Sequence, residues 1–233
     1  MKHALAFILL AVMSARADAA LEPASLAPDC PLPALPASLQ MDAINSGSVE
    51  LVVDIGADGT PTDWLVLAYT EPRLARACTD SLPSWRFRPA RIDGVAVPSQ
   101  SEFTVNFTVS GVVLTSNMGD EMLLRSIRDS DDHLTVLTCS PTKLDRAPVR
   151  TAGGSPTYAA QAALLGVQGK VTVHFYIDEN GTVRMPSVDP DAHPYLAKQA
   201  LDAILSWKFE PPTSRRQPVL IAAEEQFKFG PVQ

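Results

Sequence analysis

The chain has few of the residues from which catalytic and metal sites are usually built. Its four histidines are scattered along 233 residues: His3, His133, His174 and His193. None has the spacing of a Ser/His/Asp arrangement or of a metal site. Residues 129–133 and 189–193 combine aspartates with a histidine, but we interpret both as turn and capping segments. The run 153–155 (Gly-Gly-Ser) lacks the spacing of a phosphate-binding loop. We therefore predict a protein that is not an enzyme and has no cofactor, metal or small-molecule substrate.

Positive charge is also scarce. Lysine and arginine number 19 against 26 aspartates and glutamates, which gives a formal net charge of −7. Nucleic acids and anionic lipids attract proteins through clustered positive charge. The composition therefore disfavours a nucleic-acid partner.

The chain has only three cysteines, Cys30, Cys78 and Cys139. An odd number in an exported protein is typical of one disulfide and one remaining thiol. Cys78 lies on the apolar side of a predicted helix, so it is either a buried thiol or the partner of Cys30. The sequence does not choose between the two.

Long apolar runs are absent except at the N-terminus. There, 11 apolar or small residues (4–14) follow Lys2 and His3, and small residues follow them up to Ala20. A spanning helix needs roughly 20 residues, so we predict that residues 1–19 are a cleaved signal peptide. An uncleaved anchor in the inner membrane is the less favoured alternative.

What the chain does have is an internal repeat. At a constant offset of 122 residues, segments 47–107 and 169–229 are identical at 17 of 61 positions. The shared residues include two turn glycines and a Trp-x-Phe-x-Pro motif. A single offset over the whole length indicates two tandem copies of one fold.

Each copy shows the same order of patterns. Two alternating apolar strands flank an Asp-Gly or Asn-Gly turn, a helix begins at a proline, and a last strand follows the Trp-x-Phe-x-Pro motif. This predicts an α+β fold: two tandem copies of a small antiparallel sheet with helices packed on one face. The motif aromatics are expected in the cores: Trp85, Phe87, Trp207 and Phe209.

The predicted boundaries follow from the repeat. After the signal peptide comes a proline-rich, extended lead (20–36), then a first domain (37–110), a connector (111–154) and a second domain (155–230). Residues 145–155 are expected to form a flexible passage between the domains, and residues 156–166 a helix ended by glycine.

The second copy resembles a known family. A hairpin of the form Gly169-x-Val-x-Val-x-Phe-x-Ile-x-x-x-Gly181, followed by Trp207-x-Phe-x-Pro211 and a Pro-Val strand, is similar to the C-terminal domain of TonB. The resemblance covers residues 155–229. The first copy, from about residue 34 to 109, is a diverged version with Ala96 where the second has Pro218.

The resemblance implies a periplasmic domain that grips outer-membrane transporters. In the family, the edge of the last strand pairs with a short extended segment of the transporter, the TonB box. Strand addition of this kind depends on main-chain hydrogen bonds. The matching residues here are Arg215, Arg216, Gln217, Pro218, Val219, Leu220, Ile221, Glu224, Gln226 and Lys228. The alternative is that the charges of this strand only protect an exposed edge.

The chain departs from an energy-transducing TonB in two respects. Its apolar N-terminal run is short, and the spacer after it is only about 16 residues long. If the leader is removed, the protein is not expected to carry force from the inner membrane itself. The second hypothesis is therefore a periplasmic scaffold, in which the two domains dock or dimerise through their edge strands.

Overall fold

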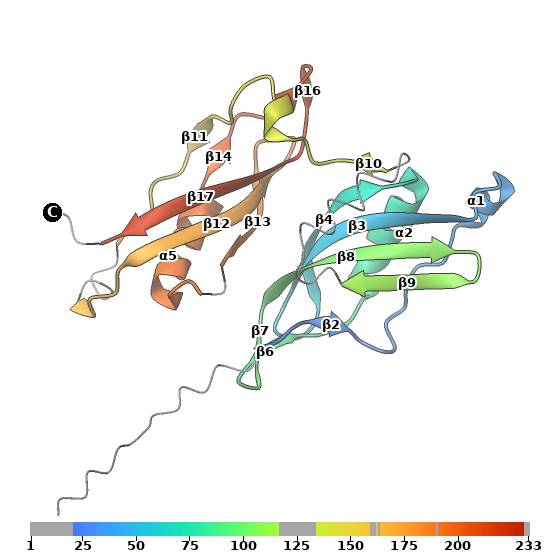
Figure 1. The fold of residues 1–233 in the computed structure, drawn as a ribbon, viewed down its shortest axis with the longest axis horizontal. Coiled ribbons are helices and arrows are strands. Elements are labelled where there is room, and N and C mark those ends of the chain that lie inside the picture. Colours follow the sequence, from blue (N-terminus) through green and yellow to red (C-terminus); the bar gives the residue numbers. More distant parts are fainter. Residues whose placement is uncertain (1–20, 117–133, 159–161, 163, 190, 231–233) are drawn as a thin grey trace, which may run out of the picture.

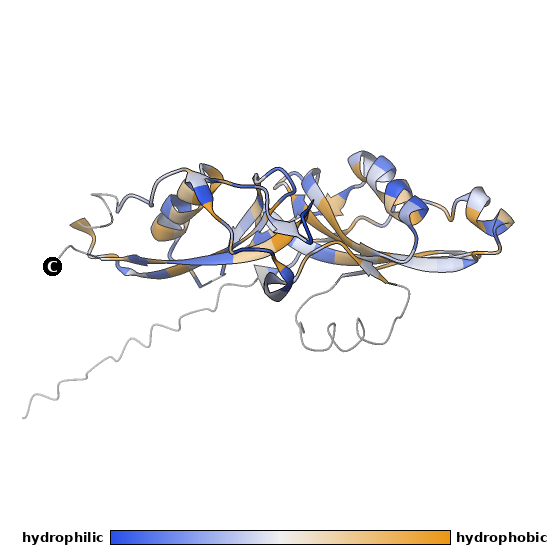
Figure 2. Ribbon diagram, turned by 90° about the horizontal axis from the view of Figure 1, so that it is seen from above, coloured by the Kyte–Doolittle hydropathy of each residue, from blue (hydrophilic) through white to orange (hydrophobic). Residues whose placement is uncertain are grey.

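The computed structural model describes residues 21–116, 134–158, 162, 164–189 and 191–230 (Figure 1). The predicted signal peptide therefore lies outside the described residues, as do residues 159–161 and 163 of the helix expected over 156–166. The described chain is rich in antiparallel strands and has few helices, so the α+β class is confirmed in broad terms. The helices lie along one side of the sheets, as Figure 2 shows.

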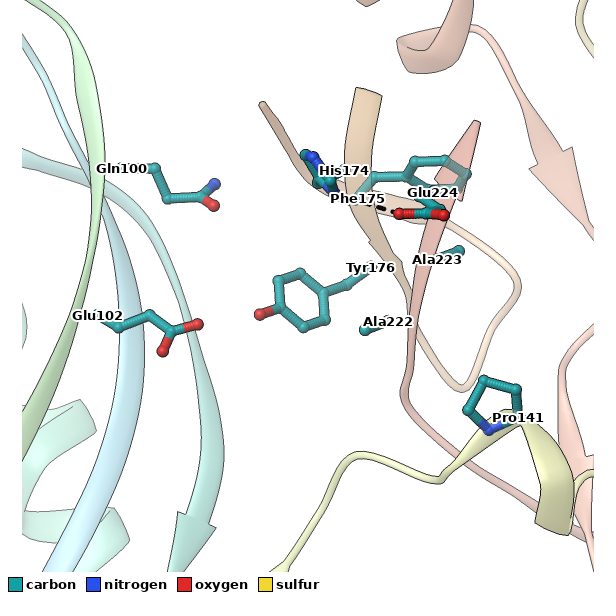
Figure 3. A pocket seen from close by; sticks show the side chains of 9 residues that line it. All are labelled: Gln100, Glu102, Pro141, His174, Phe175, Tyr176, Ala222, Ala223 and Glu224. Atoms are coloured by element: carbon teal, nitrogen blue, oxygen red, sulfur yellow. Dashed lines mark ion pairs between the residues drawn. The ribbon is translucent and has the colours of Figure 1, made fainter. Parts of the chain in front are cut away.

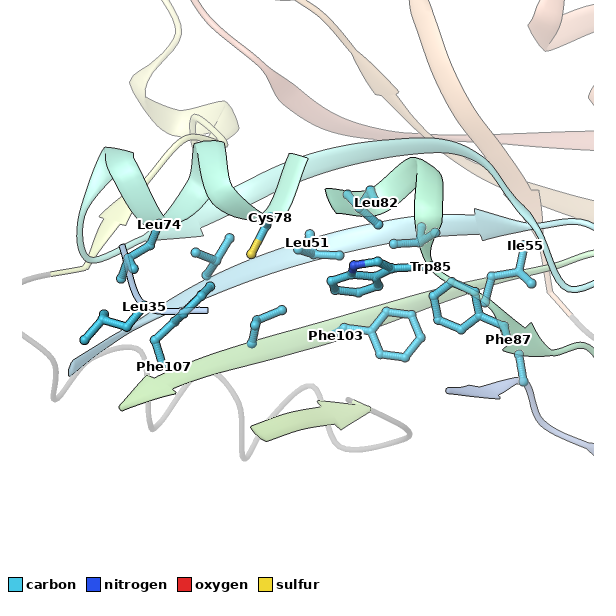
Figure 4. Close-up of a cluster of buried hydrophobic side chains, with 14 of the residues drawn as sticks. Leu35, Leu51, Ile55, Leu74, Cys78, Leu82, Trp85, Phe87, Phe103 and Phe107 are labelled. Atoms are coloured by element: carbon cyan, nitrogen blue, oxygen red, sulfur yellow. The ribbon is translucent and has the colours of Figure 1, made fainter. Parts of the chain in front are cut away.

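The first sheet has five strands in the order β10-β4-β3-β8-β9, and every neighbouring pair is antiparallel. Its strands are β3 (Ser46–Ile55), β4 (Pro61–Tyr69), β8 (Ser99–Thr108), β9 (Gly111–Ser116) and β10 (Thr135–Val136). Alternate residues of β3, from Val49 to Ile55, are buried in one core with Leu74 and Cys78 of α2 (Pro72–Ser81), and Ile55 lies beside Phe87 at the far end of that core (Figure 4). This is the alternation expected of a sheet with one covered face.

Smaller elements close the ends of this first core. They are β1 (Leu21–Glu22), β2 (Ser25–Leu26), α1 (Ala37–Met41), the 3₁₀ turn η1 (Leu82–Ser84), β5 (Phe87–Arg88), β6 (Ala90–Ile92) and β7 (Val95–Val97). β1 pairs with β6, and β2 pairs with β5. The lead is extended as expected, but it belongs to the fold, because Ala24 and Leu35 are buried in the first core. Strands of two residues are too short to show periodicity, so the sequence did not reveal them.

The second sheet has three strands in the order β13-β12-β17. They are β12 (Gly169–Ile177), β13 (Val183–Val188) and β17 (Ile221–Phe229), and α5 (Pro194–Leu205) packs against them. The remaining elements are η2 (Pro141–Lys143), β11 (Arg150–Ala152), β14 (Lys208–Phe209), β15 (Thr213–Ser214) and β16 (Gln217–Pro218). Leu196, Ala200 and Ile204 of α5 form the buried stripe.

The two sheets are built around the same contact between a turn and the Trp-x-Phe-x-Pro motif. The N–H of Phe87 donates to the carbonyl of Gly59, and the N–H of Phe209 donates to the carbonyl of Gly181, each at 2.9 Å. A Cβ on Gly59 would lie 2.1 Å from the Phe87 carbonyl oxygen, and one on Gly181 would lie 2.0 Å from that of Phe209. Only glycine permits this approach, which explains why both turn glycines recur at the repeat offset.

The aromatic residues of each motif pack in or against the core of their own repeat. Trp85 is fully buried and Phe87 nearly so, while Trp207 is 5% exposed and Phe209 is half-buried. The Trp207 ring meets that of Phe175 edge-on at 6.4 Å. Pairs in this geometry stabilise a core beyond their buried area.

Residues 145–155 pack against the second repeat, where the sequence suggested a flexible passage between the domains. β11 pairs with β14, and the indole N–H of Trp207 donates to the carbonyl of Gly154 at 2.7 Å. A Cβ on Gly153 would lie 2.4 Å from the Trp207 ring. The glycines of this segment therefore permit close packing.

All three cysteines are thiols in this structure. Cys78 is buried in the first core, and Cys30 packs against the same core from the lead. Burial raises the pKa of Cys78 to about 12. This buried thiol corresponds to the first of the two possibilities left open by the sequence.

Candidate partner-binding edge

The strand predicted to bind a partner forms one edge of the second sheet. β17 pairs with β12 along its whole length, from Ile221 opposite Ile177 to Phe229 opposite Gly169. Within the part of the chain that the structure describes, no strand pairs with its other side. β17 thus presents a row of backbone N–H and C=O groups to an incoming strand.

The predicted edge is not one continuous strand. Gln217 and Pro218 form β16 and pair with β15, so the first part of the segment belongs to a short hairpin. Next to it, the N–H of Cys139 donates to the carbonyl of Leu220 at 2.7 Å. The connector therefore occupies the edge at Leu220, and the open part begins at Ile221.

The side chains of the predicted site divide between the core and solvent. Ile221 is buried in the second core and Val219 is half-buried against it, so these two anchor the strand, while Leu220 is buried outside that cluster. The remaining predicted residues of β17 are exposed: Glu224, Gln226 and Lys228. The sequence predicted a strand ending at Phe229, and β17 ends there but begins only at Ile221. The sequence pattern did not separate the buried positions from the exposed ones.

The last strand of the first repeat differs at this edge. β8 has β3 on one side, and on the other its residues Phe103–Thr108 pair with β9, from Ser116 back to Gly111. Val112 and Leu114 of β9 pack against the first core. The sheet therefore continues past residue 110, where the sequence suggested that the first domain ends.

The two predicted arginines lie at the tip of the β15–β16 hairpin. Arg215 and Arg216 have φ values of 51° and 65°, in the left-handed region. Asp145 accepts hydrogen bonds from both of their backbone N–H groups, at 2.9 and 2.8 Å. The hydrogen bond from the Arg216 N–H, with further ones from Thr213 and Arg215, lowers the pKa of Asp145 below its usual value.

The two sheets make a contact that the sequence did not predict. Met185 of β13 is 2% exposed and clusters with Val52 and Leu67 of the first sheet, with Leu65 and Tyr176 beside them. The β12–β13 register shifts between His174 and Tyr176, and Met185 has a φ of 50°. Such a bulge re-aims side chains, and here it turns Met185 toward the first sheet.

Polar contacts surround this apolar cluster. The Arg184 guanidinium donates to both carboxylate oxygens of Asp63, at 3.1 and 2.5 Å. The Gln100 amide donates to Asp54 and to the Met185 carbonyl, at 2.9 and 3.0 Å. One difference between the copies falls at this interface. The second copy has Arg184-Met185-Pro186 where the first has Thr62-Asp63-Trp64.

A pocket of about 580 Å³ lies between the two sheets, beside the start of β17. Gln100 and Glu102 project from β8 toward Tyr176, His174 and Glu224 of the second sheet (Figure 3). The His174 ring is 3.1 Å from Asp189 and 3.8 Å from Glu224. Among the described residues, no group of histidine, cysteine and acidic side chains is arranged to hold a metal ion. His193 caps α5, which is the capping role expected of this segment.

The comparison with known families identifies the repeated unit. Two segments, 33–109 and 154–231, match the family described as Gram-negative bacterial TonB protein C-terminal, and together they cover more than half of the chain. The chain belongs to this family. The resemblance inferred for both copies is therefore confirmed.

TonB C-terminal domains are transport and interaction domains of the Gram-negative envelope, not enzymes, and they interact with outer-membrane transporters. A search of the curated proteins finds no match to this chain. None of the helices in the described part of the chain has the length and apolar character needed to cross a membrane.

Proposed function

We propose that this protein is a periplasmic TonB-like protein that captures an extended segment of an outer-membrane transporter by strand addition at β17. The observation that carries the proposal is the unpaired side of β17, in a chain whose other copy covers the equivalent strand over Phe103–Thr108. Main-chain pairing would supply the affinity. The exposed Glu224, Gln226 and Lys228 would contact the partner's side chains.

The first repeat supports this proposal by showing what an added strand looks like on this fold. β9 lies antiparallel to β8 and sets Val112 and Leu114 against the core. Leu114 and Val112 stand opposite Val105 and Phe107 of β8, and the corresponding residues of β17 are Phe227, which is half-buried, and Phe229, which is buried. A segment with apolar residues at alternate positions would cover the Phe227 ring as Leu114 covers the first core.

The docking of the two sheets favours a scaffold role as a second function. Met185 and the Arg184–Asp63 pair join the sheets within one chain. This contact sets β13, an edge strand of the second sheet, against the face of the first sheet, whereas the scaffold hypothesis expected docking through the edge strands of both domains. Because docking leaves β17 open, the two functions are compatible.

The test closes the open side of β17 with a strand copied from the first repeat. Residues 230–233 are replaced by a copy of residues 108–116, which form the last residue of β8, the turn and β9 in the first repeat. Fluorescently labelled peptides copy the periplasmic N-terminal segments of the TonB-dependent transporters encoded by the same genome. We expect peptide binding to the closed variant to weaken by at least about tenfold, because the added strand competes for the same backbone groups.

A nine-residue Gly/Ser extension at the same site is the matched control and is expected to bind like the wild type. Equal binding by the closed variant, with the added strand shown by NMR to be paired with β17, would contradict capture at this edge.

A further inference from the structure

The two copies have the same tight turn but make it from different residues. In the first copy, β6 and β7 are joined by Asp93-Gly94, with Ile92 paired to Val95. In the second, β15 and β16 are joined by Arg215-Arg216, with Ser214 paired to Gln217. The two dipeptides are 122 residues apart, at the offset of the repeat.

Both turns impose the same backbone conformation. The φ values are 51° and 78° in the first turn and 51° and 65° in the second. Two-residue turns with both φ positive favour Asn-Gly or Asp-Gly, because side chains with a Cβ are strained in this region. The first copy has the favoured pair, and the second holds two arginines where their backbone is disfavoured. The turn itself therefore does not explain the arginines.

The surroundings of the second turn compensate for this strain and leave the guanidinium groups available. Asp145 accepts both backbone N–H groups, and the Ser214 hydroxyl donates to the Lys143 carbonyl at 2.7 Å. Arg215 and Arg216 are exposed, and neither guanidinium forms an ion pair with another described residue. Strained residues held in place by their neighbours are typical of functional positions.

The turn lies close to the candidate binding edge. Only Gln217–Leu220 separate it from the start of β17, and Lys143 adds a third positive charge nearby. The protein as a whole carries a net charge of −7. A local group of cations on an acidic protein favours an anionic partner, while the overall charge opposes an anionic membrane surface.

We propose that Arg215 and Arg216 bind the carboxylates of an acidic stretch in the protein segment that pairs with β17. This inference rests on the function proposed above. Guanidinium groups form paired, charge-assisted hydrogen bonds with carboxylates. They would fix the end of the bound strand, and with it the register along β17.

The test gives the second turn a dipeptide of the favoured kind. The double variant Arg215→Asn/Arg216→Gly removes two charges and suits the backbone. The control, Arg76→Gln/Arg88→Gln, removes two charges from exposed sites of the first repeat. Binding is measured with the same transporter peptides, and with versions in which each Asp or Glu is replaced by Asn or Gln.

We expect the turn variant to keep its unfolding midpoint or raise it by up to roughly 5 °C. It should bind acidic peptides about three- to tenfold more weakly, with a flatter salt dependence, and lose its preference for acidic over amide peptides. A purely structural role for the arginines predicts neither the loss of discrimination nor the stable fold. The control should bind as the wild type does.

The contrary outcomes are distinguishable. Unchanged binding by the turn variant, while the closed β17 variant binds poorly, would overturn the role of the arginines alone. Failure of every peptide to bind the wild type would overturn both proposals. Arginine-dependent binding to phosphatidylglycerol vesicles, with peptide binding unaffected, would reassign the turn to a phosphate headgroup and overturn the acidic-segment proposal.

Discussion

β8 and β17 are the last strands of two copies of one fold, yet they meet different neighbours. Each lies antiparallel to the first strand of its own hairpin, β3 or β12. The other side of β8 pairs with β9 over six residues, whereas no described strand pairs with that side of β17. The two copies thus share the same core but differ at the outer edge of the last strand. This difference separates the residues that fold the unit from those that are available to a partner.

The second difference lies on the sheet surfaces. Val52 and Leu67 of the first sheet are covered by Met185, so this part of the first sheet serves as a platform for the second. On the side away from this contact, the second repeat has the unpaired edge of β17 and the turn that carries Arg215 and Arg216. Duplication has produced one copy with a docking face and another with an accessible edge.

The largest effect is expected when the tryptophan that both copies share is removed. Trp207→Ala should lower the free energy of unfolding of the second repeat by about 3–5 kcal/mol, because it empties a buried aromatic site. Trp85→Ala should do the same to the first repeat. Denaturant unfolding followed by NMR signals of each repeat measures the two losses separately. A loss under about 1 kcal/mol would show that the tryptophan is not part of the core.

An intermediate effect is expected at the contact between the sheets. Met185→Asp places a charge among Val52, Leu67 and Tyr176 and should remove about 2–3 kcal/mol of docking free energy. Small-angle X-ray scattering should then show a larger radius of gyration, with unchanged circular dichroism. Met41→Asp, at a site 87% exposed, is the control. An unchanged radius would mean that Met185 does not hold the repeats together.

The smallest effect concerns the carboxylate beneath the arginine turn. The folded-state pKa of Asp145 is lowered, so its charge stabilises the hairpin above its unfolded pKa of about 4. This contribution is lost as the pH falls through the lower folded-state pKa. Amide exchange at Arg215 and Arg216 should therefore be slower in wild type than in Asp145→Asn at pH 6, and the two should converge toward pH 2. A constant difference across this range would exclude the carboxylate charge as the cause.

The repeat, the strands and the helix faces could be predicted from the sequence because each leaves a local pattern. Glycines at turns, alternation along β3 and β12, and prolines at helix starts all depend on neighbouring residues. The motif aromatics were expected in the cores for the same reason, although Phe209 is only half-buried.

The features that distinguish the copies depend on contacts between distant segments. β9 looks like a connector until its pairing with β8 is seen, and Met185 looks like an ordinary strand residue until the bulge turns it outward. Asp145 is 70 residues from the turn whose backbone it binds. Leu220 and Ile221 were counted with the partner-binding residues, since strand alternation alone does not show where the connector crosses the edge.

The most direct test of the account is residue-resolved amide hydrogen exchange with and without a transporter peptide. We predict that the peptide protects amides in Ile221–Phe229 and leaves those of Phe103–Thr108 unchanged, because β9 already covers β8. Binding accompanied by protection in the first repeat, with none in β17, would contradict the claim that the open edge of the second repeat is the binding site.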